Sequence, residues 1–227
     1  MNQPNPRVSV SPTAELAAFE AAGEIARQAR AAVAERGAFT IAISGGRSPW
    51  TMLSHLADLD MPWADTTIFQ VDERIGAADD PLRNLTGLLD SLPAGCPAVV
   101  VPMPVEADDL DAACVAYAAA LPATLDLIHL GLGSDGHTAS LIPGDPVLDI
   151  AEADVALTGT YQGRRRMTLS YPRIARARAV LWLVTGAEKR DAFAQLLAHD
   201  RTIPAGRITN PDQVVFCDAA ARPSPHS

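Results

Sequence analysis

The sequence predicts an α/β protein with a mostly parallel sheet and helices on both of its faces. Three observations lead to this prediction, the first being that short apolar segments alternate with longer segments of helical periodicity. Second, several apolar segments end directly in glycine or charged residues, as parallel strands do before a turn. Third, the 227 residues are 48% hydrophobic and 20% charged, a globular composition. We expect one domain over residues 1–227, with loose termini at 1–9 and 218–227.

The chain is expected to begin with a long packing helix that starts at Ser11-Pro12 and stops at Gly37. Its inward face is predicted from apolar and small residues at helical spacing, namely Leu16, Phe19, Ala22, Ala26, Ala29 and Val33. A strand at 39–43 follows, and a glycine turn leads from it into a second helix capped by Ser48-Pro49. That helix is expected to direct inward Met52, Leu53, Leu56 and Leu59.

The same alternation continues through the rest of the chain. Further strands are expected at 66–71, 98–101, 125–130, 167–170, 178–184 and 214–217, with helices at about 108–121 and after Gly186. Loops that leave the carboxyl ends of parallel strands lie along one edge of a sheet, where ligands bind. The loops that begin at Ser44, Asp72, Gly131 and Gly186 should therefore converge on one crevice.

Charge and composition exclude several classes of partner. The net charge of −9 opposes any general affinity for nucleic acid or anionic membranes, so an anionic ligand would need a local basic pocket. No segment has the roughly 18 apolar residues of a membrane span, and residues 1–6 lack the apolar region of a secretory signal, so we expect a cytoplasmic protein. The three cysteines, Cys96, Cys114 and Cys217, are too scattered to predict a disulfide framework or a zinc site.

The turn after the first predicted strand is a candidate anion site. Ser44, Gly45, Gly46 and Arg47 precede the second helix, where free backbone N–H groups and the helix dipole favour a phosphate. A tight connection without a ligand explains these residues as well. Among the 18 basic residues only Lys189 is a lysine, and it stands in the first turn of the last long helix. The helix dipole disfavours a cation at that position unless an anionic ligand binds beside it. The alternative is that Lys189 forms an ion pair with a neighbouring acid.

His137 is the strongest candidate for chemistry, because it lies in a glycine loop directly after a strand. A neutral imidazole can take a proton from water, and Asp135 could orient it. Arg74 could neutralise a developing oxyanion, and Asp72 could accept hydrogen bonds from sugar hydroxyls, unless these residues form a surface ion-pair cluster. Of the arginines at 164–166, we expect Arg166 to face inward.

Two other kinds of site are not expected. The spacing Gly131-x-Gly133-x-x-Gly136 matches a dinucleotide-binding motif, but that motif must open a long helix. Here Pro143 leaves room for barely two turns after His137, so we do not expect NAD. No pair of histidines has convincing zinc spacing, and we predict neither a metal nor a cofactor.

Four motifs, spread from about Val10 to Cys217, resemble those of the glucosamine-6-phosphate isomerase/6-phosphogluconolactonase superfamily. They are Ser44-Gly45-Gly46 with Pro49, Val71-Asp72-Glu73-Arg74 with Asn84, the block from Gly131 to Leu141, and Arg166-Met167-Thr168 with Gly186-x-x-Lys189. Two residues depart from the usual pattern, because Arg47 and Arg83 stand where serine is common. We therefore assign no role to Arg83.

The resemblance implies a Rossmann-like, doubly wound fold and hydrolysis of 6-phospho-D-glucono-1,5-lactone to 6-phosphogluconate in the pentose phosphate pathway. In that reaction His137 would activate a water, Asp135 would hold the imidazole and Arg74 would stabilise the oxyanion. The substrate and its phosphate would be bound by Ser44, Gly45, Gly46, Arg47, Asp72, Arg166 and Lys189. The expected partner is this small molecule alone, with no nucleic acid and no membrane, and the protein would be a monomer or a small homo-oligomer.

Two alternatives stay open. The first is a glucosamine-6-phosphate deaminase or sugar-phosphate isomerase, whose members carry Ala-Phe-Asn-Glu-Pro after the histidine. This chain instead has Ala139-Ser140-Leu141-Ile142-Pro143 without the acid, and Arg74 where deaminases usually have tyrosine, so both positions favour the lactonase. The second alternative is a non-catalytic sugar-phosphate sensor, which would need a DNA-binding helix-turn-helix. We expect no such element before the first helix.

Overall fold

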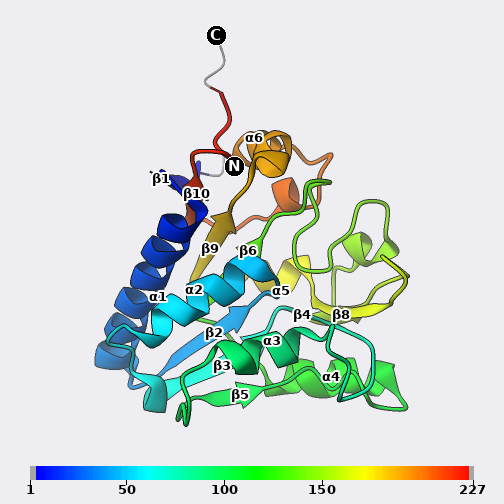
Figure 1. The fold of residues 1–227 in the computed structure, drawn as a ribbon. Helices are drawn as coiled ribbons and strands as arrows, with labels where there is room; N and C mark the ends of the chain where they lie inside the picture. The colour runs from blue at the N-terminus through cyan, green and yellow to red at the C-terminus, as the bar shows by residue number, and fades with distance from the viewer. Residues whose placement is uncertain (1–3, 225–227) are drawn as a thin grey trace.

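A seven-stranded sheet forms the centre of the computed structural model, which describes residues 4–224 (Figure 1). Its strands lie in the order β1-β10-β9-β6-β2-β3-β5, and every neighbouring pair is parallel. The strands are β1 (Arg7–Ser11), β2 (Phe39–Ile43), β3 (Thr66–Gln70), β5 (Val99–Val101), β6 (Leu127–Gly131), β9 (Ala179–Val184) and β10 (Gln213–Asp218). The predicted parallel α/β sheet is confirmed.

Helices cover both faces of this sheet (Figure 1). One face packs against α1 (Ala14–Arg36), α2 (Arg47–Ala57) and α3 (Asn84–Ser91), and the other against α4 (Leu110–Ala120), α5 (Tyr171–Ala175) and α6 (Arg190–Leu197). Short 3-10 turns lie at Trp63–Asp65, Pro146–Asp149, Ala187–Lys189 and Ala205–Arg207. The alternation of side chains along β9 explains why both faces of the sheet need helices. Leu181 and Leu183 enter one core, while Val180, Trp182 and Val184 enter the other.

A second, smaller sheet was not predicted. It is antiparallel, with β4 (Asp72–Arg74) and β7 (Val155–Leu157) on either side of β8 (Arg166–Leu169). The expectation that Asp72 begins a loop is therefore wrong. The chain leaves β3 at Val71, whose carbonyl accepts from the Leu169 N–H at 2.8 Å, and continues as β4. In this register Arg74 lies directly opposite Arg166.

The expected start of the first helix is also wrong. Thr13 is the N-cap of α1, because its hydroxyl accepts from the Leu16 N–H at 3.2 Å, whereas Ser11 belongs to β1. The end at Gly37 is confirmed, with a positive φ of 76° and an N–H that donates to the Val33 carbonyl. The side of α1 that faces the sheet consists of alanines and Ile25, while Phe19 is 47% exposed.

The termini are more ordered than expected over the described residues. Residues 7–9 belong to β1, which pairs with β10 at the edge of the sheet, and Asp218 is the last residue of β10. Ala221 is fully buried, so the chain stays packed beyond that strand. The rest of the predicted loose ends, residues 1–3 and 225–227, lies outside the described part of the chain.

The strand order creates a switch point between β2 and β6. From β2 the chain continues to β3 and β5 on one side, and from β6 it continues to β9 and β10 on the other. In such sheets the neighbouring loops diverge and leave a crevice outside the carboxyl ends of the two strands. Ser44 follows β2 directly and Leu132 follows β6, so both residues start at this crevice.

Candidate active site

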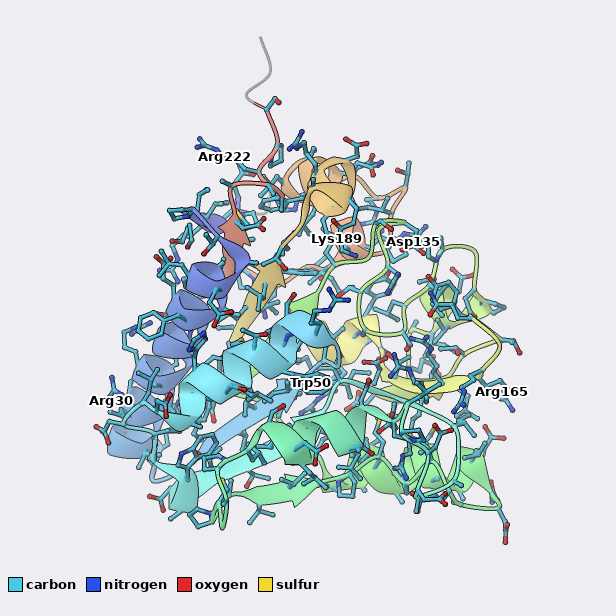
Figure 2. All side chains as sticks on the ribbon, in the orientation of Figure 1. Arg30, Trp50, Asp135, Arg165, Lys189 and Arg222 are labelled. Atoms are coloured by element: carbon cyan, nitrogen blue, oxygen red, sulfur yellow. The ribbon has the colours of Figure 1, made fainter. Side chains whose placement is uncertain are left out.

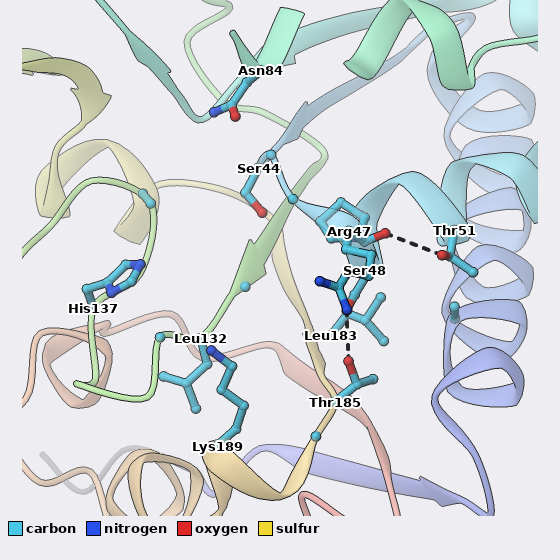
Figure 3. Close-up of a pocket in the computed structure, with 18 of the residues that line it drawn as sticks. Ser44, Arg47, Ser48, Thr51, Asn84, Leu132, His137, Leu183, Thr185 and Lys189 are labelled. Atoms are coloured by element: carbon cyan, nitrogen blue, oxygen red, sulfur yellow. Dashed lines mark hydrogen bonds between the residues drawn. The ribbon is translucent and has the colours of Figure 1, made fainter. Parts of the chain in front are cut away.

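A cavity of about 720 Å³ lies at the carboxyl edge of the central sheet. Its wall includes every predicted site residue except Asp135, namely Ser44, Gly45, Gly46, Arg47, Asp72, Arg74, His137, Arg166 and Lys189. Figure 2 shows Asp135 and Lys189 at the same end of the molecule, far from Arg30. Figure 3 shows the His137 ring and the Lys189 side chain directed from different loops into one space. The predicted convergence of distant loops is confirmed.

The loop after β2 lines this cavity. Gly46 caps α2 with a φ of 131°, a conformation that side chains other than glycine rarely adopt. Gly45 packs so closely that an added Cβ would lie 2.0 Å from Asn84 Oδ1. The hydroxyls of Ser48 and Thr185, 2.8 Å apart, tie the start of α2 to the end of β9 (Figure 3). The first N–H groups of α2 lack intrahelical partners and can bind an anion.

A buried histidine supports this loop from below. His129 lies inside β6, and its Nδ1 is 3.1 Å from Ser44 Oγ. Burial lowers the pKa of His129 to about 3, so its imidazole is neutral at pH 7. His129 therefore supports Ser44 through a hydrogen bond and adds no charge to the cavity. No role for His129 was predicted, because a histidine within an apolar strand resembles any other core residue.

The glycine loop after β6 fixes the position of His137. The Gly133 N–H donates to the His137 carbonyl at 2.8 Å, and the His137 N–H donates to Asp135 Oδ1 at 3.2 Å. His137 Nδ1 lies 2.5 Å from the same carboxylate oxygen. With Nδ1 donating its proton to Asp135, Nε2 keeps a free lone pair that can accept a proton. Gly133 makes this arrangement possible, since an added Cβ would lie 2.1 Å from His137 Nδ1.

Asp135 lies behind His137 and does not reach the cavity wall. Burial raises the pKa of its carboxyl, but the charge and hydrogen bonds of His137 and a hydrogen bond from Tyr161 outweigh burial and leave the pKa below its ordinary value. The Tyr161 hydroxyl donates to Asp135 Oδ2 at 3.0 Å. Asp135 is thus an ionised acceptor at neutral pH, with one oxygen toward the histidine and the other toward the tyrosine.

The small sheet supplies a polar part of the cavity wall. Asp72 accepts a hydrogen bond from the Ser140 hydroxyl at 2.6 Å and lies 4.0 Å from the Arg166 guanidinium. Arg74 donates to Asn84 Oδ1 at 3.0 Å. Arg166 is 6% exposed, and its Nε has no hydrogen-bond partner among residues 4–224. This wall therefore combines a carboxylate with two cations that can bind a polar, anionic ligand.

We expect the buried charge of Asp72 to lower the stability of the folded protein at neutral pH. Burial raises the pKa of its carboxyl, although Ser140 and Arg166 oppose this effect. A raised pKa in the folded state means that stability is highest below the ordinary pKa of about 3.9 and falls as the pH rises through the folded value. We expect Asp72→Asn to raise the free energy of unfolding at pH 7 by about 1 kcal/mol. Urea unfolding at pH 7 and below pH 4 measures this.

In that experiment the two proteins should converge at the acidic pH, where the Asp72 carboxyl is protonated in both the folded and the unfolded state. A lower unfolding midpoint for Asp72→Asn at pH 7 would contradict the expectation. It would mean that the charge of Asp72 stabilises its surroundings more than burial disfavours it.

Several other charged residues pair with one another and do not line the cavity. Arg164 pairs with Asp80, and Arg83 is buried against Glu106 and Glu73, away from the cavity wall. Glu73 is fully buried; its carboxylate accepts from the N–H groups of the first two residues of α3, at 2.7 and 2.8 Å. These side chains hold the scaffold together.

Lys189 and Arg47 line the cavity, and neither forms an ion pair within the described part of the chain. Both cations are therefore available to a ligand. The ion pair that the sequence allowed for Lys189 is absent from residues 4–224.

Sequence reasoning missed several contacts of the site. Tyr161 and Gln162 belong to the hairpin between β7 and β8, and Gln162 lines the cavity. Ser140 and Asn84 hold Asp72, with Asn84 Nδ2 donating to the Asp72 carbonyl at 2.9 Å. Only the resemblance to the family motif had pointed to Asn84 as a residue of the site. Nothing in the sequence pointed to Tyr161 as a residue of the site except the turn-forming Gln162-Gly163 pair beside it.

Two further observations limit what the site can hold. Among residues 4–224, no three histidine, cysteine or acidic side chains gather as a metal ion would require. After Gly133 the described chain forms turns, with a bridge between Thr138 and Leu141, where a dinucleotide motif needs a long helix.

No helix of the described residues has the length and apolar character to cross a membrane.

Fold and site together define an α/β protein with a small-molecule site at the switch point of a parallel sheet, where a histidine held by an aspartate shares one cavity with a glycine turn and several cations. Residues 12–217 match the family described as glucosamine-6-phosphate isomerases/6-phosphogluconolactonase. The chain belongs to this family.

Individual relatives agree with this assignment. A 6-phosphogluconolactonase of Synechocystis sp. is 38% identical over 182 residues, which cover 74% of this chain and 75% of that protein. The structure of 6-phosphogluconolactonase from Trypanosoma brucei superposes with a TM-score of 0.82 at 25% identity, covering 97% of this chain and 98% of that one. A monomeric glucosamine-6-phosphate deaminase reaches 0.85 at 20% identity over 95% and 98% of the chains, which shows the shared fold alone.

Proposed function

We propose that this protein is an enzyme that hydrolyses 6-phospho-D-glucono-1,5-lactone to 6-phosphogluconate, the lactonase step of the pentose phosphate pathway. The observation that carries the proposal is the His137–Asp135 pair, which faces a wall of cations and backbone amides across one cavity. Relatives named 6-phosphogluconolactonase support the same activity. The cytoplasmic location and the monomeric or small homo-oligomeric state expected from the sequence are part of this proposal.

In the proposed mechanism His137 acts as a general base. Its Nε2 takes a proton from a water molecule, whose oxygen attacks the C1 carbonyl carbon of the lactone. Asp135 holds Nδ1 and stabilises the imidazolium that forms. Arg74 neutralises the tetrahedral oxyanion. When the bond between C1 and the ring oxygen breaks, the imidazolium returns its proton to that oxygen, which leaves a carboxylic acid and a hydroxyl.

The phosphate group of the substrate is bound by other residues of the cavity wall. Ser44, Gly45 and Gly46 supply a hydroxyl and N–H groups, while Lys189, Arg47 and Arg166 supply positive charge. Asp72 accepts hydrogen bonds from sugar hydroxyls. A lactone is an activated ester, so a general base and charge stabilisation suffice, and the mechanism needs neither a covalent nucleophile nor a metal or cofactor.

The experiment compares 6-phospho-D-glucono-1,5-lactone with unphosphorylated glucono-1,5-lactone. Acid release is followed in a pH-stat, and the spontaneous hydrolysis of each compound is subtracted. We expect acceleration of the phosphorylated compound with a clear preference in kcat/KM. Ammonia release from glucosamine 6-phosphate would instead support the deaminase. Binding of 6-phosphogluconate without lactone hydrolysis would support a sensor.

A further inference from the structure

A tight hairpin carries an aromatic side chain over the site. The strands β7 and β8 continue past their ends, because the Thr158 N–H donates to the Arg166 carbonyl at 2.9 Å and Tyr161 pairs with Arg164. The two residues at the tip, Gln162 and Gly163, have positive φ values of 51° and 80°. Two such residues are typical of the turn that closes a two-residue hairpin. Tyr161 therefore sits on a hydrogen-bonded position of the hairpin.

Tyr161 contacts three of the residues that the mechanism uses. Its hydroxyl donates to Asp135 Oδ2 at 3.0 Å, opposite the oxygen that faces His137. Its ring meets the His137 ring edge-on, with centroids 5.5 Å apart and an interplanar angle of 62°. The Arg166 guanidinium lies over the ring, 5.2 Å from its centroid. One side chain thus joins the predicted general base to a cation of the anion site.

The neighbouring residue reinforces this arrangement. Gln162 Oε1 accepts a hydrogen bond from the Arg166 guanidinium at 3.3 Å. Tyr161 itself is only half-buried and belongs to neither hydrophobic core, so its contacts are polar and aromatic and do not fill the interior. A substitution at this position can therefore be interpreted without a cavity in the core.

We propose that Tyr161 is a positioning residue, which holds Asp135 so that His137 keeps its proton on Nδ1 and at the same time orients Arg166. The inference rests on the proposed lactonase function for its kinetic consequences. The hydroxyl fixes one oxygen of Asp135, and the other then stays aligned with His137 Nδ1. The ring face holds the guanidinium by a cation–π contact. The two effects are separable, because phenylalanine removes the first alone and leucine removes both.

The kinetic test uses Tyr161→Phe and Tyr161→Leu. We expect Tyr161→Phe to lower kcat about tenfold with KM nearly unchanged, the lower end of what the loss of one hydrogen bond to a charged group predicts. Tyr161→Leu should lower kcat equally and also raise KM about threefold, because Arg166 loses its aromatic support. In an Asp135→Asn background, Tyr161→Phe should change kcat less than about twofold, since its effect passes through Asp135.

Tyr171→Phe is the matched control. It removes a hydroxyl that donates to the Pro204 carbonyl at 2.9 Å, away from the cavity wall, and should leave both kinetic constants unchanged. An unchanged kcat in Tyr161→Phe, or the same loss with and without Asp135, would overturn the proposal.

A measurement independent of activity separates this inference from the proposed function. In ¹⁵N-labelled protein, long-range proton–nitrogen spectra report which ring nitrogen of His137 carries the proton. We expect Nδ1–H in the wild type and a mixture of both forms in Tyr161→Phe. If the wild type does not hydrolyse the lactone, the proposed function fails while this spectrum still tests the positioning role. Identical spectra of the two proteins would refute that role.

Discussion

His137→Ala is expected to lower kcat by about 10²- to 10⁴-fold and to leave KM within a few-fold of the wild type. The substitution removes the group that takes the proton from water, whereas the anion-binding residues on the other walls of the cavity stay in place. The remaining rate should come from Arg74 and from the binding of the substrate in one orientation. Steady-state kinetics with the spontaneous rate subtracted measure both constants.

His199→Asn provides the control for this variant. His199 follows α6 with a positive φ of 51°, a conformation that asparagine adopts readily, and it does not line the cavity. Its kinetic constants should equal those of the wild type. Turnover near the wild-type rate in His137→Ala would remove the histidine from the mechanism, even if the lactonase activity itself is established.

Lys189→Ala is expected to raise KM for the phosphorylated lactone by about 10- to 100-fold and to change kcat little. The ammonium has no acidic partner within the described residues, so a ligand phosphate would be its counter-ion. Hydrolysis of the unphosphorylated lactone should not respond, because that compound has nothing for the lysine to bind. The ratio of kcat/KM for the two compounds measures the effect.

Arg190→Ala is the matched control, since it removes a cation from the next residue. Arg190 is exposed, donates to the Ala220 carbonyl at 2.9 Å and does not line the cavity. Its KM should stay at the wild-type value. Equal changes in both variants would indicate a general electrostatic effect, and no change in Lys189→Ala would exclude this residue from phosphate binding.

Much of the fold could be predicted because local patterns determine it. The buried strands β2, β3, β6 and β9 are short segments rich in apolar and β-branched residues between turn residues, so their positions were predicted to within about two residues. β1 was missed because its sequence, Arg-Val-Ser-Val-Ser, is short and half polar, as suits an edge strand with one free side. Its pairing with β10 depends on a contact across nearly the whole chain.

The sequence predicts the parts of the site that lie at the ends of parallel strands. It does not predict the parts whose position depends on which strands pair and in what register. Ser44, His137 and Lys189 follow parallel strands, and the fold rule alone brings such loops together. Tyr161 lies on a hairpin whose position depends on the register of β8 against β4, which no local pattern reveals. The inward face of α1 was predicted correctly at Ala22, Ala26 and Ala29 but wrongly at Leu16 and Phe19, which are exposed because close packing against the sheet selects alanine over larger side chains.

The small sheet places Arg74 and Arg166 directly across from each other on neighbouring strands. Two positive side chains in that relation repel, and Arg74 contributes to a lowered pKa of Arg166, whose main cause is burial. Asp72, 4.0 Å from the Arg166 guanidinium, offsets part of this repulsion. Negative charge on a ligand beside these guanidinium groups would reduce the repulsion, so part of the preference for an anion follows from the register of the small sheet.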